Sequence, residues 1–281
     1  MDFSVVMSVY SKDRFDSIRR AITSITTDQI CKPAEVIIIE DGPVAEEVEA
    51  YLSSLESSSA PITIIRLPHN RGLAHALNVG VRNTSTDWIA RMDADDYSLP
   101  YRFERQVTYL ESHLEVDVLG SALQEFTEPQ YDHIIWGEKR LLPRSSSEIS
   151  AYARFQSPVH HPTVMIRKSA LLSVDGYPED SGHFEDYQLW ERMLLNGAQF
   201  ANISEVLLGY RVDSGAYNRR GGWHMMRDEI ALQKQFYKDG FTSRSQFIRN
   251  VIIRGLYRLV PTSIKKPLYR LRTAVKNHNT V

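Results

Sequence analysis

Three aspartates follow an apolar stretch in the sequence IARMDADDYSLP, at residues 89–100. An aspartate at a strand end often forms a turn or caps the next helix, and a lone D-x-D pattern is most simply explained that way. Asp93, Asp95 and Asp96 together are harder to explain, because neighbouring carboxylates repel one another unless a cation lies among them. Hard divalent ions bind carboxylate oxygens together with substrate phosphates. The pattern therefore indicates a Mn²⁺ or Mg²⁺ site that binds a diphosphate.

The segments that must position these aspartates alternate between two hydrophobic patterns. Short apolar runs, typical of strands that are buried on both faces, occupy residues 4–9, 35–42, 62–67 and 87–96. Apolar residues at helical spacing predict helices at residues 15–25, 45–58, 72–84 and 101–113. This alternation predicts βαβ units with a mostly parallel sheet, and hence an α/β fold.

The ends of these strands are where a ligand is expected. In parallel α/β sheets, ligands bind beyond the carboxyl ends of the strands. Three strand ends carry distinctive polar residues, at 8–12, 40–42 and 93–96. We expect all three to face one crevice.

Past residue 115 the alternation is less regular. The expected elements are a strand or hairpin at 116–126, a strand, short helix and loop at 161–177, a helix at 185–197, short strands at 198–203 and 206–212, and a helical region from 223 onward. The helix at 185–197 begins with Glu185 and Asp186, and acids in a first turn complement the helix dipole.

The bulk composition limits the class of protein. The 281 residues suit one large α/β domain, or one such domain with an appendage, and the net charge of −2 says little about partners. Cys31 is the single cysteine, so a reducing compartment is expected. The N-terminus lacks the pattern of a secretion signal, and no stretch reaches the roughly 18 apolar residues of a membrane span. We therefore expect a cytosolic protein unless something peripheral tethers it.

Residues 241–281 contain no Asp or Glu, and their basic residues alternate with apolar ones. The basic residues are Arg244, Arg249, Arg254, Arg258, Lys265, Lys266, Arg270, Arg272 and Lys276. This basic amphipathic pattern is typical of helices that lie on anionic membrane surfaces. A terminal helix packed on the domain, with a solvated basic face, is the alternative. Nucleic-acid binding is disfavoured, because the rest of the chain has no basic stripe.

Five motifs recur in a characteristic order and spacing. They are SVVMSVYSKDR at 4–14, IIIEDGP at 37–43, NRGLAHALNVGV at 70–81, IARMDADDYSLPYRFERQ at 89–106 and EDYQLWERML at 185–194. Together they resemble glycosyltransferase family 2, the inverting enzymes with the nucleotide-sugar-binding GT-A fold. The resemblance covers about residues 3–212, and it is strongest to bacterial enzymes that build O-antigen and exopolysaccharide repeat units.

The resemblance implies a Rossmann-like, mostly parallel central sheet flanked by helices. We expect a GT-A catalytic domain at residues 1–220, with a nucleotide-binding half at 1–115 and an acceptor-binding half at 116–220. A helical, basic amphipathic region at 221–281 is expected to follow.

The resemblance also implies a donor site. Ser8 and Tyr10 should line the nucleotide base pocket, and Asp41 should accept a hydrogen bond from the uracil ring. Glu40 precedes it where the family commonly has aspartate. Arg71 is a candidate ligand of the diphosphate or sugar, with a surface ion pair as the alternative. Asp95 is expected to bind the metal, and Asp93 the ribose or a metal-bound water.

The same resemblance implies a catalytic and acceptor site. Asp186 matches the family's base, which deprotonates the attacking hydroxyl, and Glu185 should orient Asp186 or hold the acceptor. Trp190 is expected to stack under the acceptor sugar, or else to lie in the core. His161, next to His160, should border the acceptor or diphosphate, although a structural role is common for such a pair. Arg211 is a further candidate, as a phosphate clamp that binds the acceptor.

Two further features lie in the segment YRVDSGAYNRR at 210–220, which resembles the family's Tyr-Arg-Val-His segment near the active site. Arg219 and Arg220 could join Arg211 in clamping phosphates, or be solvated. Asp213 stands where the family usually has a histidine, which puts a histidine metal ligand there in doubt.

The resulting hypothesis is an inverting hexosyltransferase on the cytoplasmic face of the inner membrane. It would move glucose or galactose from a UDP-sugar to an N-acetylhexosamine on undecaprenyl diphosphate, forming a β-linkage. The alternatives are a dTDP-rhamnose-dependent transferase of the same fold and a sugar-nucleotide-binding protein without turnover. A nucleotidyltransferase is disfavoured, because the chain has no Gly-rich, Lys-bearing triphosphate loop.

Overall fold

The computed structural model describes residues 1–57, 61–130, 133–212 and 222–259. The chain forms two compact units. The first consists of Met1–Asp180 and Glu185–Arg211, and the second of Ser181–Phe184 and the chain from Val212 onward. The predicted domain boundary between residues 220 and 221 falls outside the described residues and stays a prediction.

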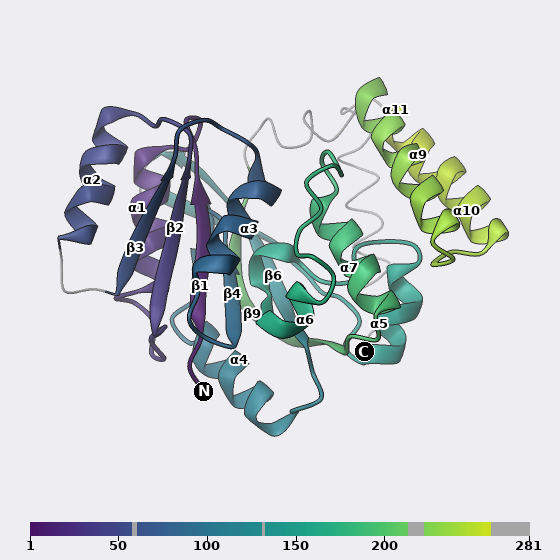
Figure 1. Cartoon of the computed structure of the whole chain (residues 1–281), viewed down its shortest axis with the longest axis horizontal. Coiled ribbons are helices and arrows are strands. Elements are labelled where there is room, and N and C mark those ends of the chain that lie inside the picture. The colour runs from purple at the N-terminus through teal and green to yellow at the C-terminus, as the bar shows by residue number, and fades with distance from the viewer. Residues whose placement is uncertain (58–60, 131–132, 213–221, 260–281) are drawn as a thin grey trace. The chain divides into compact units, whose positions relative to one another are not determined.

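Four parallel strands form the N-terminal half of the sheet, in the order β3-β2-β1-β4 (Figure 1). They are β1 (Ser4–Val9), β2 (Glu35–Asp41), β3 (Ile62–Leu67) and β4 (Trp88–Met92). Nearly every residue of β1, β2 and β4 is buried, as expected for continuous apolar runs covered on both faces. The fourth strand ends at Met92, earlier than predicted, because residues 94–95 form a turn.

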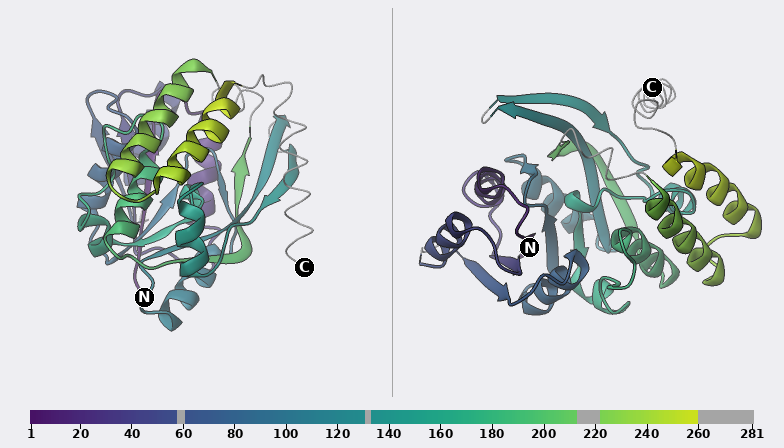
Figure 2. Two further views of the ribbon diagram at one scale, coloured as in Figure 1. Left: turned by 90° about the vertical axis from the view of Figure 1, so that its right-hand side faces the viewer. Right: turned by 90° about the horizontal axis from the view of Figure 1, so that it is seen from above.

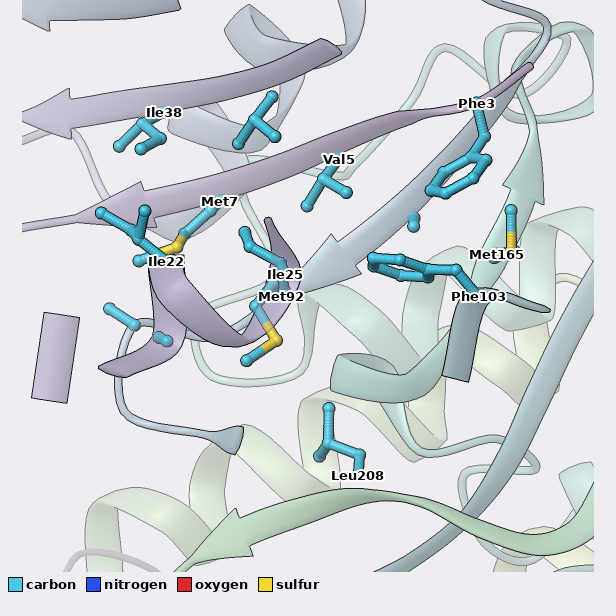
Figure 3. Close-up of a cluster of buried hydrophobic side chains, with 14 of the residues drawn as sticks. Phe3, Val5, Met7, Ile22, Ile25, Ile38, Met92, Phe103, Met165 and Leu208 are labelled. Carbon is cyan, nitrogen blue, oxygen red and sulfur yellow. The ribbon is translucent and has the colours of Figure 1, made fainter. Parts of the chain in front are cut away.

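Helices cover both faces of these strands. They are α1 (Phe15–Ile25), α2 (Glu46–Glu56), α3 (Leu73–Asn83) and α4 (Arg102–Ser112). Helices α1, α2 and α4 share one core with alternate strand residues such as Val5 and Met7, which Figure 3 shows beside Ile22 and Phe103. Helix α3 packs on the opposite face, in the core that contains Val6.

Beyond β4 the sheet is mixed. Its remaining strands are β5 (Tyr97–Ser98), β6 (Val118–Gln130), β7 (His133–Arg140), β8 (Met165–Arg167) and β9 (Phe200–Arg211). Strand β8 pairs antiparallel with both β4 and β6. Strand β9 pairs parallel with β6, and β5 pairs antiparallel with β9. Figure 2 shows the long strands β6 and β7 side by side. The two short strands expected around residue 205 are one strand, β9, which has a register irregularity instead of a break.

The remaining helices of the first unit lie on the α3 side of the sheet. They are α5 (Ser146–Ala153), the 3-10 turn η1 (His161–Thr163), α6 (Lys168–Leu172) and α7 (Glu185–Leu195). Buried residues of α5, α6 and α7 belong to the same core as those of α3. This core therefore connects the helix that begins with Glu185 to the strands that end near the D-x-D motif.

The parallel register brings the polar strand ends to one edge of the sheet. Val9, the last residue of β1, lies opposite Glu40 of β2, and Met7 lies opposite Met92 of β4. The loops that follow β1, β2 and β4 therefore leave the sheet at the same edge, as the sequence predicts.

From Trp223 to Leu259 the second unit consists of helices joined by a turn at residues 239–243. Its elements are α9 (Trp223–Lys238), α10 (Arg244–Asn250), the π-helical turn η2 (Val251–Gly255) and α11 (Leu256–Leu259). The side chain of Ser243 caps α10 in a capping box with Gln246. The prediction of helix from Trp223 onward is confirmed as far as Leu259. Among the described residues, no helix is long and apolar enough to cross a membrane.

Candidate active site

The D-x-D turn at the end of β4 is tied to the end of β9. Asp96 is fully buried, and its Oδ1 accepts a hydrogen bond of 2.9 Å from the backbone N–H of Arg211. The Arg211 side chain donates from Nε to Asp95 Oδ2 at 3.4 Å. The Asp95 side chain nevertheless stays 43% exposed. Asp96 is thus the structural member of the turn, whereas Asp95 is available to a ligand.

A buried arginine compensates part of this negative charge. Arg91, the residue before the last of β4, makes an ion pair from Nη2 to Asp93 Oδ1. Its Nε and Nη1 are buried and have no hydrogen-bond partner among the described residues. Burial alone would lower the pKa of Arg91, but the charge and hydrogen bond of Asp93 raise it, so that Arg91 stays a cation.

The carboxylates at this edge remain crowded despite the two arginines. Burial raises the pKa of Asp95, and the charge of Asp93 raises it further. Burial likewise raises the pKa of Asp96 well above its usual range, with further contributions from Asp93 and Asp95. A divalent cation would relieve this repulsion.

The donor set fits a metal ion that is also bound by a substrate. Among the described residues, no group of three His, Cys, Asp or Glu side chains converges on a point where it could enclose an ion. Asp93 and Asp95 are both partly exposed. Mg²⁺ and Mn²⁺ are commonly held by one or two carboxylates, with substrate phosphates and water completing the shell. The two aspartates therefore match a metal–diphosphate site and not a closed all-protein cage.

The loop after β1 adds an acid that the sequence reasoning missed. Asp13 Oδ2 accepts a hydrogen bond of 3.0 Å from the backbone N–H of Tyr10, and Asp13 N–H donates to Tyr10 O at 3.0 Å. Burial raises the pKa of Asp13 to about 7, and the charges of Asp95 and Asp93 contribute. The end of β1 therefore lies within electrostatic range of the D-x-D turn. Tyr10 itself is exposed and Ser8 partly so, which leaves both accessible to a nucleotide.

Asp41, at the end of β2, anchors the loop that begins α3. Its Oδ1 accepts from the backbone N–H of Arg71 at 2.8 Å and its Oδ2 from that of Gly72 at 2.9 Å. Gly42 follows with φ +81°, and a Cβ there would lie 2.5 Å from the backbone nitrogen of Asn70. Asp41 is only 3% exposed, and the predicted bond of its carboxylate to uracil stays a prediction.

Arg71 points its side chain into solvent. The side chain is 60% exposed, and its Nη2 lies 3.8 Å from Glu179 Oε2. This is the surface ion pair that the sequence left open as an alternative. The predicted contact of Arg71 with a diphosphate or sugar stays a prediction.

The loop before α7 is fixed by Asn78 of α3. Asn78 Nδ2 donates to Tyr177 O at 2.8 Å, and Tyr177 N–H donates to Asn78 Oδ1 at the same distance. His75, one turn earlier on α3, contacts Glu179 at 3.1 Å. A helix on one face of the sheet thus sets the path of the chain shortly before the predicted base.

Glu185 and Asp186 begin α7 and are both partly exposed. Asp186 Oδ1 accepts from the backbone N–H of Tyr187 at 2.7 Å. Burial raises the pKa of Asp186, and it raises that of Glu185 to about 7, with the charge of Asp186 as the next contribution. The charge of Asp93 raises both pKa values and that of Arg91 lowers both. The two acid pairs therefore share one electrostatic environment.

The structure corrects the expected position of Trp190. The indole is fully buried, with its ring edge-on to His161 at 5.8 Å and to Phe200 at 5.9 Å between centroids. It lies in the core, the alternative that the sequence left open. Helical periodicity places Trp190 one turn after Asp186, but the side chain points toward the sheet, so that it cannot stack under an acceptor sugar.

His161 also contacts the protein interior in place of an acceptor. Its Nε2 lies 3.0 Å from the hydroxyl of Tyr177, in a buried contact. Burial lowers the pKa of His161 well below its usual range, and the charge of Arg91 contributes. His161 therefore packs in the interior as a neutral imidazole, which is the structural role that the sequence left open. The neighbouring His160 contacts the carbonyl oxygen of Arg140 at 3.3 Å.

Comparison with known proteins decides the family. The family model described as Glycosyl transferase family 2 matches residues 4–174. The chain belongs to this glycosyltransferase family. It is 34% identical over 272 residues to the amylovoran biosynthesis glycosyltransferase AmsE of Erwinia amylovora, covering 95% of this chain and 97% of AmsE. It is also 34% identical over 270 residues to an Escherichia coli UDP-Gal:α-D-GlcNAc-diphosphoundecaprenol β-1,3-galactosyltransferase, covering 95% of each.

Solved structures support the GT-A fold of this family 2 glycosyltransferase. Staphylococcus aureus TarS 1–349 in complex with UDP-GlcNAc superposes with a TM-score of 0.63 and 16% identity, over 89% of this chain and 70% of TarS. The mannosyltransferase PcManGT of Pyrobaculum calidifontis, in complex with GDP-Man and Mn²⁺, superposes with a TM-score of 0.61 and 16% identity, over 90% of this chain and 68% of PcManGT. The predicted fold class is therefore confirmed.

In this family 2 glycosyltransferase, the sequence reasoning missed Arg91, Asp13 and Asn78. Each lies within one of the five quoted motifs, but its role depends on contacts made in the folded chain, which the motif does not specify. Arg211 is found at the D-x-D turn, where it contacts Asp95. Arg219, Arg220 and Asp213 lie outside the described residues.

Proposed function

We propose that this glycosyltransferase moves a hexose, glucose or galactose, from a UDP-sugar to an N-acetylhexosamine carried on undecaprenyl diphosphate. This transfer would be one step in the synthesis of a repeat unit of a bacterial O-antigen or exopolysaccharide. The observation that carries this proposal is that the D-x-D turn and the start of α7 interact electrostatically. Asp93, which pairs with the buried Arg91, raises the pKa of both Asp95 and Asp186. The Escherichia coli relative, a UDP-Gal:α-D-GlcNAc-diphosphoundecaprenol β-1,3-galactosyltransferase, supplies the substrate class, and AmsE supplies the link to polysaccharide synthesis.

The donor would bind across the ends of β1, β2 and β4. Tyr10 and Ser8 would flank the base, and Asp41 would accept from the uracil N–H. Asp95 and Asp93 would hold a Mn²⁺ or Mg²⁺ ion. When bound, such an ion stabilises the negative charge that develops on the departing diphosphate. Arg211, which already contacts Asp95, would contribute positive charge beside the phosphates of donor or acceptor.

The transfer would be a single displacement with inversion. The acceptor hydroxyl oxygen forms a bond to the anomeric carbon, and the bond from that carbon to the diphosphate oxygen breaks. The diphosphate leaves with the electron pair, and the hydroxyl proton passes to the carboxylate of Asp186. A UDP-α-hexose would therefore give a β-linkage. The raised pKa of Asp186 increases its basicity relative to an exposed aspartate, which suits this role.

The lipid-linked acceptor implies work at a membrane surface. The basic residues between 241 and 281 would attract the chain to the anionic cytoplasmic face of the inner membrane. This attraction would bring the catalytic unit close to an acceptor diphosphate at the headgroup level.

The test is nucleotide release from UDP-glucose, UDP-galactose and dTDP-rhamnose with a synthetic GlcNAc-diphosphate-lipid and Mn²⁺. We expect release with one UDP-hexose, loss of release with EDTA, and loss in Asp95→Ala. The control Asp28→Asn changes an exposed aspartate elsewhere in the first unit and should leave the rate unchanged.

The other outcomes separate the alternatives. Release with dTDP-rhamnose alone would replace the donor assignment. Metal-dependent UDP binding without release from any donor would contradict the proposed acceptor or indicate a protein without turnover. An absence of nucleotide binding would contradict the whole site assignment.

A further inference from the structure

The consecutive elements α10, η2 and α11 form one continuous helical segment, which we call the second helix. Some of its polar side chains contact α9. Asn250 Nδ2 donates to Gln233 Oε1 at 2.8 Å. Arg254 Nε and Arg258 Nη2 donate to the carboxylate of Glu229 at 2.6 and 2.8 Å. Glu229, Gln233 and Asn250 have no exposed surface. These buried bonds fix which side of the second helix faces α9, because breaking them would leave a buried charge without its partners.

The opposite side of that helix carries apolar residues in the open. Ile248, Ile252 and Ile253 are 47%, 53% and 51% exposed, and we call these three residues the isoleucine face. A surface helix normally buries its apolar side and exposes its polar one. In this helix the charged residues Arg254 and Arg258 are directed inward, and the isoleucines outward. The fold thus holds three large apolar side chains at the surface.

The helix that carries the isoleucine face has charged residues of one sign only. Arg244 and Arg249 are exposed on the same helix. From residue 241 to the C-terminus the sequence contains no Asp or Glu. Exposed apolar side chains flanked by arginines, without acids, match the interface of an anionic bilayer, where apolar groups enter the acyl boundary and cations meet phosphates. A protein partner could also cover the isoleucines. It would have to be acidic to match the arginines, and no observation on this chain points to such a partner.

We propose that the isoleucine face docks the protein on an anionic lipid bilayer by inserting Ile248, Ile252 and Ile253 at the interface. This proposal goes beyond electrostatic attraction by a basic tail. It assigns the membrane contact to one side of a folded helix and gives that contact an apolar component. The buried bonds of Glu229 with Arg254 and Arg258 orient that side. The contact does not depend on which sugar the catalytic unit transfers.

The test is flotation of the full chain with vesicles of phosphatidylcholine alone or mixed with phosphatidylglycerol, at low and high salt. The variant I248Q/I252Q/I253Q should bind mixed vesicles at least about tenfold more weakly than the unchanged protein, at both salt concentrations. The variant R244Q/R249Q should weaken binding mainly at low salt, because exposed charges are screened at high salt. Circular dichroism checks that both variants fold.

A matched control separates this face from exposed apolar residues in general. The variant I30Q/L114Q/L195Q changes three exposed apolar residues of the first unit, which are 62%, 77% and 50% exposed. It should bind vesicles as the unchanged protein does. An equal loss of vesicle binding in both triple variants would overturn the proposal.

Three further results would also overturn it. These are unchanged vesicle binding in the isoleucine variant, no vesicle binding by the unchanged protein, and a shift from dimer to monomer in that variant with vesicle binding intact. The last would mean that a second copy covers the face. Transfer to a water-soluble short-chain acceptor should be the same in the isoleucine variant and the unchanged protein. Vesicle binding is measured without sugar transfer, so a failure of the proposed transferase activity would not affect the test of the isoleucine face.

Discussion

At the scale of single residues, the candidate site is a cluster of acids held together by two arginines. Arg91 pairs with Asp93 from a buried position, and Arg211 reaches Asp95. The sequence predicts the acids, because a run of carboxylates at a strand end is unusual. It does not predict the role of Arg91. The sequence pattern alone does not show whether an arginine in an apolar strand is buried in an ion pair or lies exposed at the edge of the sheet.

The role of Arg91 predicts how the protein responds to metal. The variant Arg91→Met removes a buried cation and leaves the carboxylates with less compensation, so we expect a lower Tm without divalent ions. The rise in Tm on adding Mn²⁺ should be larger than in the unchanged protein, because the ion then relieves more repulsion. Arg167→Met, which removes the remote ion pair with Asp117, should leave the Mn²⁺ effect unchanged. An equal Mn²⁺ effect in Arg91→Met would contradict this role.

The raised pKa of Glu185 predicts a pH dependence of stability. Burial raises this pKa from the ordinary 4.5 to about 7, so between these values the folded state binds more protons than the unfolded state. The contribution of Glu185 to stability therefore falls as the pH rises through this window. We expect Glu185→Gln to raise Tm, relative to the unchanged protein, more at pH 8 than at pH 5. A Tm difference that is constant with pH would show that Glu185 does not titrate in this way.

At the scale of secondary-structure elements, α3 connects the donor and base ends of the site. Its first turn is anchored by Asp41, and its Asn78 holds the loop that leads toward α7. The βαβ units could be predicted because they are local in sequence. The antiparallel insertion of β8 between β4 and β6 could not, since it depends on pairing between distant segments. The inward direction of Trp190 also depends on which side of α7 meets the sheet.

Asn78 offers a test of this connection. Asn78→Ala leaves the buried backbone groups of Tyr177 without their hydrogen bonds, which should cost about 2–4 kcal/mol of unfolding free energy. It should also lower kcat, because the chain that leads to Asp186 loses its anchor. Asn83→Ala, on the same helix but exposed, should have little effect on either quantity. Chemical denaturation and steady-state kinetics of both variants would decide, and a loss of less than 0.5 kcal/mol, about the size of a surface substitution, would contradict the anchoring role.

At the scale of the whole molecule, each of the two units has its own interior. The first is built on apolar cores on both faces of the sheet. The second contains the buried bonds of Glu229 in addition to apolar residues such as Phe236 and Phe241. The sequence indicates the helical region by its amphipathic pattern. It does not show that arginines point inward, because periodicity alone assigns basic residues to the solvent side.

This division predicts local unfolding. Glu229→Gln weakens the charged bonds to Arg254 and Arg258 and leaves the two guanidiniums without a buried counter-ion. Amide hydrogen exchange should become at least about tenfold faster in α9 and α10, while the strands β1, β2 and β4 keep their protection. Faster exchange in the sheet to the same extent would contradict the independence of the two interiors.

The most direct test of the proposed chemistry is the rate of transfer by Asp186→Asn. This substitution keeps the size of the side chain but removes its ability to accept a proton. We expect kcat to fall by about 10²–10⁴, the usual contribution of a general base, while the Kd for UDP with Mn²⁺ changes by less than about twofold. A kcat close to that of the unchanged protein would show that Asp186 is not the base and would contradict the mechanism proposed for this site.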